Sequence, residues 1–341
     1  MTADDAARAA EVVERLDDLR AVLDRRGAAA ALLGYRRNFA WLTAGGESHI
    51  VLASESGVAS LLVTRDGAVA ITQNIEAARI ADEELAGLGI ETVAVPWWEP
   101  DAMAAEARRR AGQAPLGDED LEAELLPLRS VLSPFDRSRM AQLGAAARTA
   151  LEGALATALP GVSEDELAAD LLGRLPGVRA PVVLVAADDR IGRYRHPLPG
   201  RTPARRRVML VLVAERWGLH VALTRIREFE APSPELAARV AAVADVEAAV
   251  HEATRPGATL GDVFAAAQAA YARVGFDGAW RDHHQGGTIA YQGREQIAIP
   301  DDPTVMRAGM AFAWNPSIAG AKAEDTFILD EAGARLSITA A

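Results

Sequence analysis

The sequence contains no cysteine, which excludes disulfide bonds and thiolate metal sites. It also lacks a basic excess, because 36 lysines and arginines stand against 48 aspartates and glutamates, for a formal net charge of −12. A surface for nucleic acid needs such an excess, so we expect no nucleic-acid partner. No uninterrupted apolar run is long enough to span a bilayer, and residues 1–27 carry no apolar core of signal-peptide type. We therefore expect a cytoplasmic protein that does not enter a membrane.

The 341 residues that are present suffice for two domains, each with its own core. In the first 130 residues or so, strand-like and helix-like segments alternate, which is typical of an α/β domain. The predicted helices are 6–24, 76–85 and 101–111, and the predicted strands are 28–33, 51–52, 59–63, 69–71 and 93–95. Ser133-Pro134 then favours an extended residue followed by a helix start. We therefore place the domain boundary there, giving domains 1–132 and 133–341.

The second part combines long helices with clusters of strands, so the predicted class of the whole chain is α+β. Ser163-Glu164-Asp165-Glu166 has the pattern of a capping box and predicts a helix start. The other predicted helices are 133–158, one that begins at 233 and stops before 256, and 259–274, and the predicted strands are 182–186, 208–213, 288–291, 310–314, 326–329 and 335–339.

Four short motifs in this second part carry residue types suited to chemistry. They are Arg193-Tyr194-Arg195-His196-Pro197, His283-His284-Gln285-Gly286-Gly287, Trp314-Asn315-Pro316 and Lys322-Ala323-Glu324-Asp325. The order and spacing of the last three are similar to the second half of a metallopeptidase active site. Glycine pairs also allow a backbone to approach a ligand closely.

Further segments extend this similarity over nearly the whole chain. Arg255-Pro256-Gly257-Ala258-Thr259, the strand with Leu223-Thr224-Arg225, and Arg36 to Gly45 in the first part resemble the creatinase/aminopeptidase P/prolidase superfamily, the M24 peptidases. The resemblance implies an amino-terminal α/β creatinase-like domain followed by a pita-bread domain.

The same resemblance allows the metal site to be compared position by position. Metal-dependent members bind two divalent cations through Asp, Asp, His, Glu and Glu, and the matching residues here are Val211, Ala222, His284, Asn315 and Glu324. Only two of the five ligand types remain, and a catalytic metal normally needs about three protein ligands. The nearby acids Glu215, Asp282 and Glu295 have no spacing that indicates compensation. We therefore predict an enzyme that needs no metal and no other cofactor.

Creatinase resembles this family in fold and hydrolyses a C–N bond without metal, so we predict a metal-independent hydrolase of a small nitrogen-containing substrate. The resemblance assigns acid/base work to His196, because imidazole titrates near neutrality. Glu324 is the predicted carboxylate partner, and His284 and Asn315 are predicted to hydrogen-bond the polarised group. Creatinase keeps a glutamate where Ala222 stands, so creatine is not the expected substrate.

Other residues are assigned to substrate binding. They are Asn315, Tyr291, Arg193, Arg195, His283, Lys322 and Trp41. The resemblance also implies a homodimer in which Arg36, Arg37 or Trp41 reaches the neighbour's site. Three alternatives stay open: an Xaa-Pro aminopeptidase with metals held by other ligands, a non-catalytic pita-bread module that binds a peptide or protein, and a lyase or cyclase that uses the same side chains.

Overall fold

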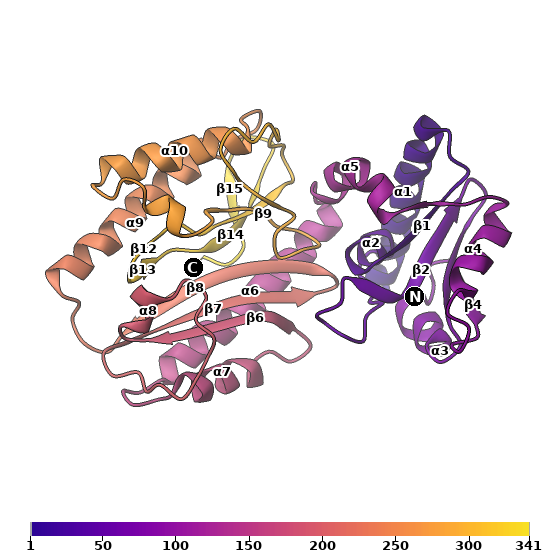
Figure 1. Ribbon diagram of the computed structural model, residues 1–341. Helices are drawn as coiled ribbons and strands as arrows, with labels where there is room; N and C mark the ends of the chain where they lie inside the picture. Colours follow the sequence, from indigo (N-terminus) through magenta and orange to yellow (C-terminus); the bar gives the residue numbers. More distant parts are fainter. Residues whose placement is uncertain (1, 341) are drawn as a thin grey trace. The chain divides into compact units, whose positions relative to one another are not determined.

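The computed structural model describes residues 2–340, which form two compact units (Figure 1). The first unit contains the residues up to Arg129 together with Trp217–Leu219, and the second contains Ser130–Arg216 and the residues from His220 onward. This division lies three residues before the boundary expected from Ser133-Pro134. None of the helices in the described part of the chain has the length and apolarity needed to cross a lipid bilayer.

The first unit is built on a five-stranded sheet in the order β4-β3-β2-β1-β5. Its strands are β1 (Ala30–Tyr35), β2 (Ser56–Thr64), β3 (Ala68–Gln73), β4 (Glu91–Val95) and β5 (Leu116–Gly117). Its helices are α1 (Ala3–Arg26), α2 (Arg36–Leu42), α3 (Ala77–Arg79), the π-helical η1 (Ile80–Glu84), α4 (Ala102–Ala111) and α5 (Asp118–Arg129). Pairs β1–β2 and β2–β3 are antiparallel, and β3–β4 and β1–β5 are parallel. The predicted α/β character of this domain is confirmed.

One local prediction in this unit is wrong, and two helices were missed. Val51 and Leu52 are not in a strand and are 61% and 43% exposed, because two apolar residues alone do not form a face that the core can bury. Helices α2 and α5 were not predicted. The first residue of α5, Asp118, accepts hydrogen bonds from the backbone of Gly34 and from Asn38, so distant residues help to place that helix.

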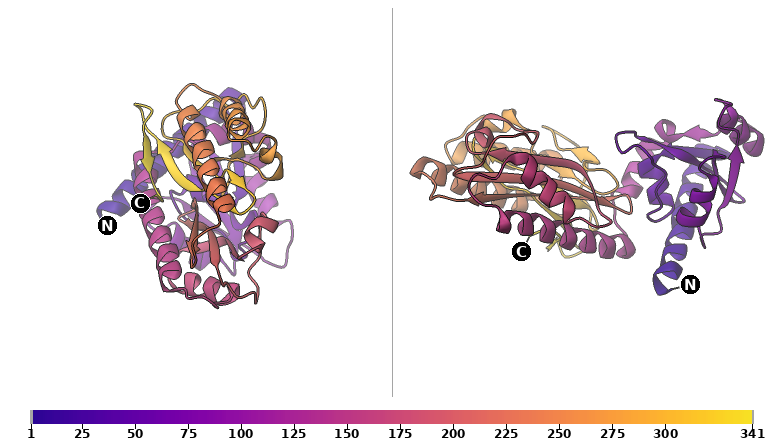
Figure 2. Two further views of the ribbon diagram at one scale, coloured as in Figure 1. Left: turned by 90° about the vertical axis from the view of Figure 1, so that its left-hand side faces the viewer. Right: turned by 90° about the horizontal axis from the view of Figure 1, so that it is seen from below.

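The second unit begins with two helices that pack on a three-stranded sheet, β6-β7-β8 (Figure 2). These elements are α6 (Pro134–Thr157), α7 (Glu164–Gly173), β6 (Arg179–Ala187), the short α8 (Arg190–Arg193), β7 (Arg207–Arg216) and β8 (Leu219–Glu228). The predicted capping box is present, since Ser163 accepts a hydrogen bond from the backbone of Glu166 and Glu166 bonds back to Ser163.

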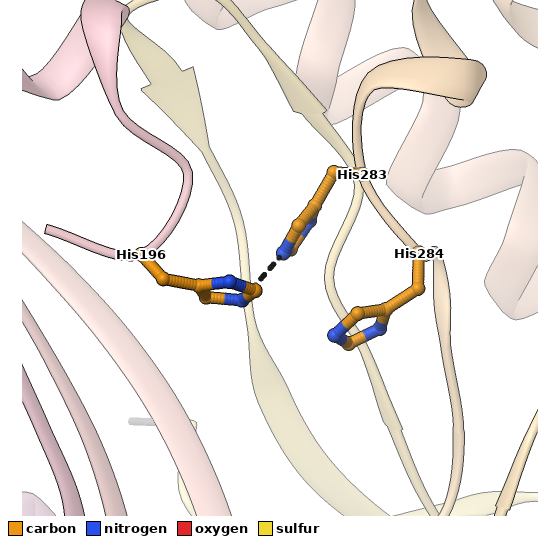
Figure 3. A group of neighbouring side chains, drawn as sticks. All are labelled: His196, His283 and His284. Atoms are coloured by element: carbon orange, nitrogen blue, oxygen red, sulfur yellow. Dashed lines mark hydrogen bonds between the residues drawn. The ribbon is translucent and has the colours of Figure 1, made fainter.

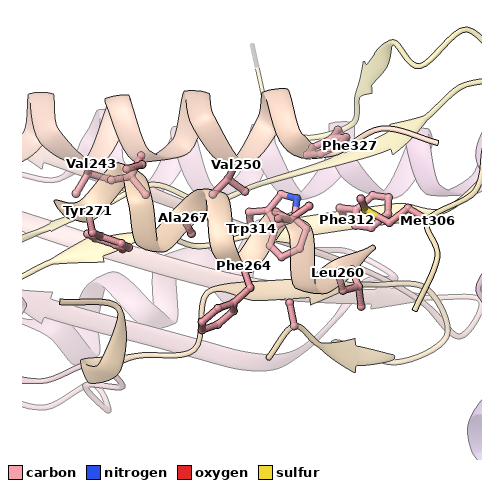
Figure 4. Packing of buried hydrophobic residues seen from close by; sticks show 14 of the residues in the cluster. Val243, Val250, Leu260, Phe264, Ala267, Tyr271, Met306, Phe312, Trp314 and Phe327 are labelled. Atoms are coloured by element: carbon pink, nitrogen blue, oxygen red, sulfur yellow. The ribbon is translucent and has the colours of Figure 1, made fainter. Parts of the chain in front are cut away.

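The remainder of this unit is a five-stranded sheet, β10-β9-β11-β14-β15, with a separate β12-β13 hairpin and two long helices. The elements are α9 (Pro234–Ala253), α10 (Leu260–Arg273), the 3-10 helix η2 (Ala279–Asp282), β9 (Gly286–Thr288), β10 (Gln296–Ile297), β11 (Ala311–Trp314), β12 (Ser317–Ile318), β13 (Ala321–Lys322), β14 (Asp325–Leu329) and β15 (Arg335–Ser337). The strand expected at 288–291 lies at 286–288 instead. Residues from both helices and from β11 and β14, among them Val250, Phe264 and Trp314, form one buried apolar cluster (Figure 4).

Hydrogen bonds also join β8 to the strand region that follows Lys322. The amide of Thr224 donates to the carbonyl of Glu324 at 3.0 Å, and the amide of Ala222 donates to Oγ1 of Thr326 at 2.9 Å. These bonds bring the strand that carries Ala222 beside the segment that carries Glu324. The α+β class predicted from the sequence is confirmed.

Candidate functional site

Three histidines meet in the second unit, although they come from two distant segments (Figure 3). His196 lies in the loop after α8, and His283 and His284 lie between η2 and β9. Nε2 of His283 is 3.2 Å from Nε2 of His196, and the ring centroids of His283 and His284 are 4.5 Å apart. His196 is exposed, whereas His283 is only 8% exposed.

Gln285 and Gly286 fix the backbone that follows the histidine pair. The side-chain amide of Gln285 donates to the carbonyl of His283 at 2.7 Å and accepts from the hydroxyl of Tyr271 at 2.9 Å. Gly286 has φ 97°, and a Cβ there would lie 2.2 Å from the carbonyl oxygen of Ala313. Glycine is therefore required at this position, because the backbone just after the histidines runs directly against β11.

Glu324 is 3% exposed and makes three short side-chain contacts. Oε2 accepts from Nζ of Lys322 at 2.7 Å and from the hydroxyl of Thr224 at 2.7 Å, and Oε1 accepts from Arg294 at 2.7 Å. Burial opposes the ionisation of Glu324, but the charges of Lys322 and Arg294 outweigh it and lower the pKa to about 2. Glu324 is thus an ionised carboxylate whose two oxygens already accept hydrogen bonds from the positively charged side chains of Lys322 and Arg294.

The three imidazoles are held neutral at neutral pH. Although His196 is exposed at the surface, the protein atoms around its ring partly desolvate it, and this desolvation, with a smaller contribution from the positive charge of Lys322, lowers its pKa. Burial and neighbouring positive charge lower the pKa of His283 to about 3 and that of His284 to about 4. Near neutral pH these side chains are therefore available as proton acceptors or as ligands.

The residues that the resemblance assigns to metal binding do not fit a carboxylate-bridged pair of metals. Val211 on β7 is packed among Leu184, Met209 and other apolar side chains, and Ala222 on β8 is fully buried. Neither side chain offers an oxygen, and the carboxylate of Glu324 is hydrogen-bonded to Lys322 and Arg294. Bridging of two metals requires carboxylates at these positions. The donor set of the described residues therefore does not form the family's two-metal site.

Several polar atoms around this site lack a protein partner. Within residues 2–340, Nδ1 of His283, Nδ1 of His284, Oδ1 of Asn315 and Oγ of Ser317 are buried without a hydrogen bond. A small pocket beside Lys322 and His283 is also lined by Tyr194, Arg195, Met209 and Ser317. Buried polar groups left without partners point to a polar guest, such as water, an ion or a substrate.

Three residues predicted to bind substrate make other contacts or line other surfaces. The hydroxyl of Tyr291 donates to the carboxylate of Asp136 on α6 at 2.7 Å, so it is committed to a structural contact. Trp41 is 3% exposed and packs in the interior of the first unit, so its side chain is not presented to a substrate. Arg193 is exposed and lines a different surface groove with Arg206 and Glu228.

Of the remaining predicted residues, Arg195 lines the pocket and pairs with Asp282 at 3.2 Å. Asn315 is buried, and its backbone N–H donates to the backbone carbonyl of Gln285 at 3.0 Å. Arg294 and Thr224 were missed by the sequence analysis, although both contact Glu324. No spacing signal marks Arg294, because its partner lies 30 residues further along the chain.

Comparison with known protein families assigns the chain to one of them. The sequence model of the family described as "Metallopeptidase family M24" matches residues 138–339 of this chain. No curated protein sequence matches the chain. The dipeptidase PepE from Mycobacterium ulcerans is 20% identical, with a TM-score of 0.78 over 98% of this chain and 96% of that one.

Two further solved structures match over nearly their whole length. The Xaa-Pro dipeptidase from Bacillus anthracis is 17% identical, with a TM-score of 0.74 over 97% of this chain and 98% of that one. The N-terminal domain of the FACT complex subunit SPT16 from Cicer arietinum is 12% identical, with a TM-score of 0.72 over 97% and 96%. At these identities the likenesses establish the fold, and they confirm the predicted pita-bread architecture.

Proposed function

The chain belongs to metallopeptidase family M24, a family of hydrolases, and we propose that it cleaves a C–N bond of a small nitrogen-containing substrate without the family's metal pair. The observation that carries the proposal is the cluster formed by Glu324, Lys322 and Arg294. Two fixed cations surround the carboxylate at the position where family members present a metal ligand.

The cations supply the electrophilic part of the mechanism. One carboxylate between two protonated side chains leaves a net positive charge beside the pocket. Lys322 carries three N–H donors, and its bond to Glu324 fixes the ammonium while the pocket stays open to it. Positive charge held in advance beside a polarised oxygen or nitrogen of the substrate stabilises the transition state. Glu324 thus positions Lys322 and Arg294 and is not the acid or base.

His196 is the proton-transfer group. Its neutral ring takes a proton from water as the oxygen of that water bonds to the substrate carbon. The protonated ring then gives the proton to the nitrogen as the C–N bond breaks, so one water is consumed and the imidazole is regenerated. His283, 3.2 Å away, orients the ring of His196.

Substrate screening tests this proposal. Small amides, ureides, guanidino compounds and dipeptides would be offered to the full-length protein in the presence of a chelator. We expect turnover there, lowered by about 10²–10⁴-fold in His196→Ala and strongly lowered in Lys322→Gln. Lys322→Arg keeps the charge and should retain part of the turnover that Lys322→Gln loses.

Arg206→Ala removes a charge from the separate surface groove, so it is the matched control and should turn over substrate like the wild type. Turnover that requires added Mn²⁺ or Co²⁺, or that is unchanged in His196→Ala, overturns the proposal.

A second candidate is a metal-dependent Xaa-Pro peptidase, which is favoured by the similarity to the Xaa-Pro dipeptidase from Bacillus anthracis. In that case only Xaa-Pro dipeptides would be hydrolysed, and only after metal is added. The same screen therefore separates the two functions.

A further inference from the structure

The geometry points to a mononuclear site for a divalent transition metal such as Zn²⁺, made of His196, His283 and His284. This site differs from the family's two-metal site, with which it shares only His284. It also goes beyond the proposed hydrolysis, because bound metal would occupy the nitrogen of His196 that transfers the proton and would reversibly inhibit turnover.

The distances between the rings suit a single ion. Each histidine offers one ring nitrogen, and these three nitrogens lie within 4.8 Å of one another. Two ligands on a tetrahedral zinc with Zn–N bonds of about 2.0–2.1 Å are separated by about 3.3 Å. The Nε2 atoms of His196 and His283 are already 3.2 Å apart. Only the ring of His284, which turns one nitrogen toward His196, has to move inward (Figure 3).

The ligand chemistry selects the class of metal. Three imidazoles with an open fourth position form the ligand set of a zinc site that keeps a water or substrate ligand. Imidazole favours Zn²⁺, Co²⁺, Ni²⁺ and Cu²⁺, whereas Mg²⁺ and Ca²⁺ favour oxygen ligands. His283 is 8% exposed, and its Nε2 already lies 3.2 Å from that of His196, so the ring is held in place for a metal on Nε2.

The charged side chains near the three histidines predict how a substitution changes the affinity for metal. Lys322 and Arg294 outnumber Glu324, so the surroundings repel a dication. Removal of the ammonium in Lys322→Gln should therefore tighten metal binding. If Lys322 had only a structural role, Lys322→Gln would not bind the metal more tightly than the wild type.

Titration calorimetry of the full-length, metal-free protein with Zn²⁺ tests the inference directly, and the visible absorption of bound Co²⁺ reports four-coordinate geometry. We expect one ion per chain, at least about tenfold weaker binding in each of His196→Ala, His283→Ala and His284→Ala, and unchanged binding in the matched controls His49→Gln and His251→Gln. Circular dichroism of every variant establishes that it is folded.

Two results overturn the inference. The first is an absence of saturable binding by Zn²⁺ and Co²⁺ in the wild-type protein. The second is binding that is lost in Glu324→Gln but kept in His196→Ala and His283→Ala, which places the ion at the family's position. Because binding is read without substrate, failure here is distinct from failure of the proposed hydrolysis.

Discussion

The ammonium of Lys322 lies 2.7 Å from the carboxylate of Glu324, which follows it closely in the chain. Both side chains are more than nine-tenths buried. A buried ion pair of this kind is costly to break, because the partner that remains keeps its charge without compensation. The pair therefore fixes the electrostatics of the site.

Replacing Lys322 by Met should destabilise the fold. Glu324 would retain Arg294 and Thr224 but lose one of its two cations, and we expect a loss of about 3 kcal/mol in the free energy of unfolding. Urea unfolding at neutral pH measures it. Lys322→Arg retains the charge and should lose less than half as much. Equal stability of Lys322→Met and wild type would contradict the importance of the pair.

Tyr291→Phe should lower stability without changing turnover. The substitution removes the hydroxyl that donates to Asp136, and loss of a buried hydrogen bond to a charged group costs about 1.5–3 kcal/mol. Thermal unfolding and steady-state kinetics separate the two effects. Tyr35→Phe, which removes an exposed hydroxyl bonded to Glu119 in the first unit, is the control for the loss of a hydroxyl. A large change in KM with unchanged stability would return Tyr291 to the substrate-binding set.

Gly286→Ala should disrupt the histidine pair. The substitution combines a φ of 97° with a Cβ placed 2.2 Å from the carbonyl oxygen of Ala313. The backbone strain costs about 1–3 kcal/mol, and the overlap adds about as much again.

Gly275→Ala is the matched control for that substitution. Gly275 has φ 84°, and a Cβ there would meet no atom within 4 Å, so its replacement adds strain without overlap. Chemical denaturation of both variants isolates the cost of the overlap. If the two variants lose the same stability, the close approach of β9 and β11 does not constrain residue 286.

His251 should make the protein less stable in acid. Burial, with the positive charge of Arg335, lowers its pKa to about 4 in the folded state, against 6.5 as its ordinary value. Below pH 6.5 the unfolded chain takes up a proton that the folded chain does not, so stability falls as the pH drops from about 6.5 toward 4. Between about pH 7.5 and pH 5 this histidine alone accounts for about 2 kcal/mol.

The measurement is the difference in unfolding free energy between wild type and His251→Gln over that range of pH. From about pH 7.5 to pH 5, the unfolding free energy of the wild type should fall by about 2 kcal/mol more than that of His251→Gln. His49→Gln, in the first unit, controls for the loss of a histidine elsewhere. A pH profile that is the same for wild type and His251→Gln would mean that His251 titrates alike in both states.

Local signals predicted many elements of this fold because they act within a few residues. The capping boxes at Ser163 and Thr259 begin α7 and α10 where expected, since each side chain bonds a backbone amide three positions later. Helix α5 was missed because its start depends on Gly34 and Asn38, which lie about 80 residues earlier. The placement of Tyr291 against Asp136 was missed for the same reason.

The sequence by itself determined which side chains cannot supply an oxygen ligand. Val211 and Ala222 carry no side-chain oxygen in any conformation, and this follows from residue identity alone. Only the tertiary structure decided what the remaining residues do. His196 meets His283 across 87 residues, and Arg294 meets Glu324 across 30, because the folded path of the chain brings them together. A hydrogen bond or an ion pair depends on distance in space, which spacing along the chain does not specify.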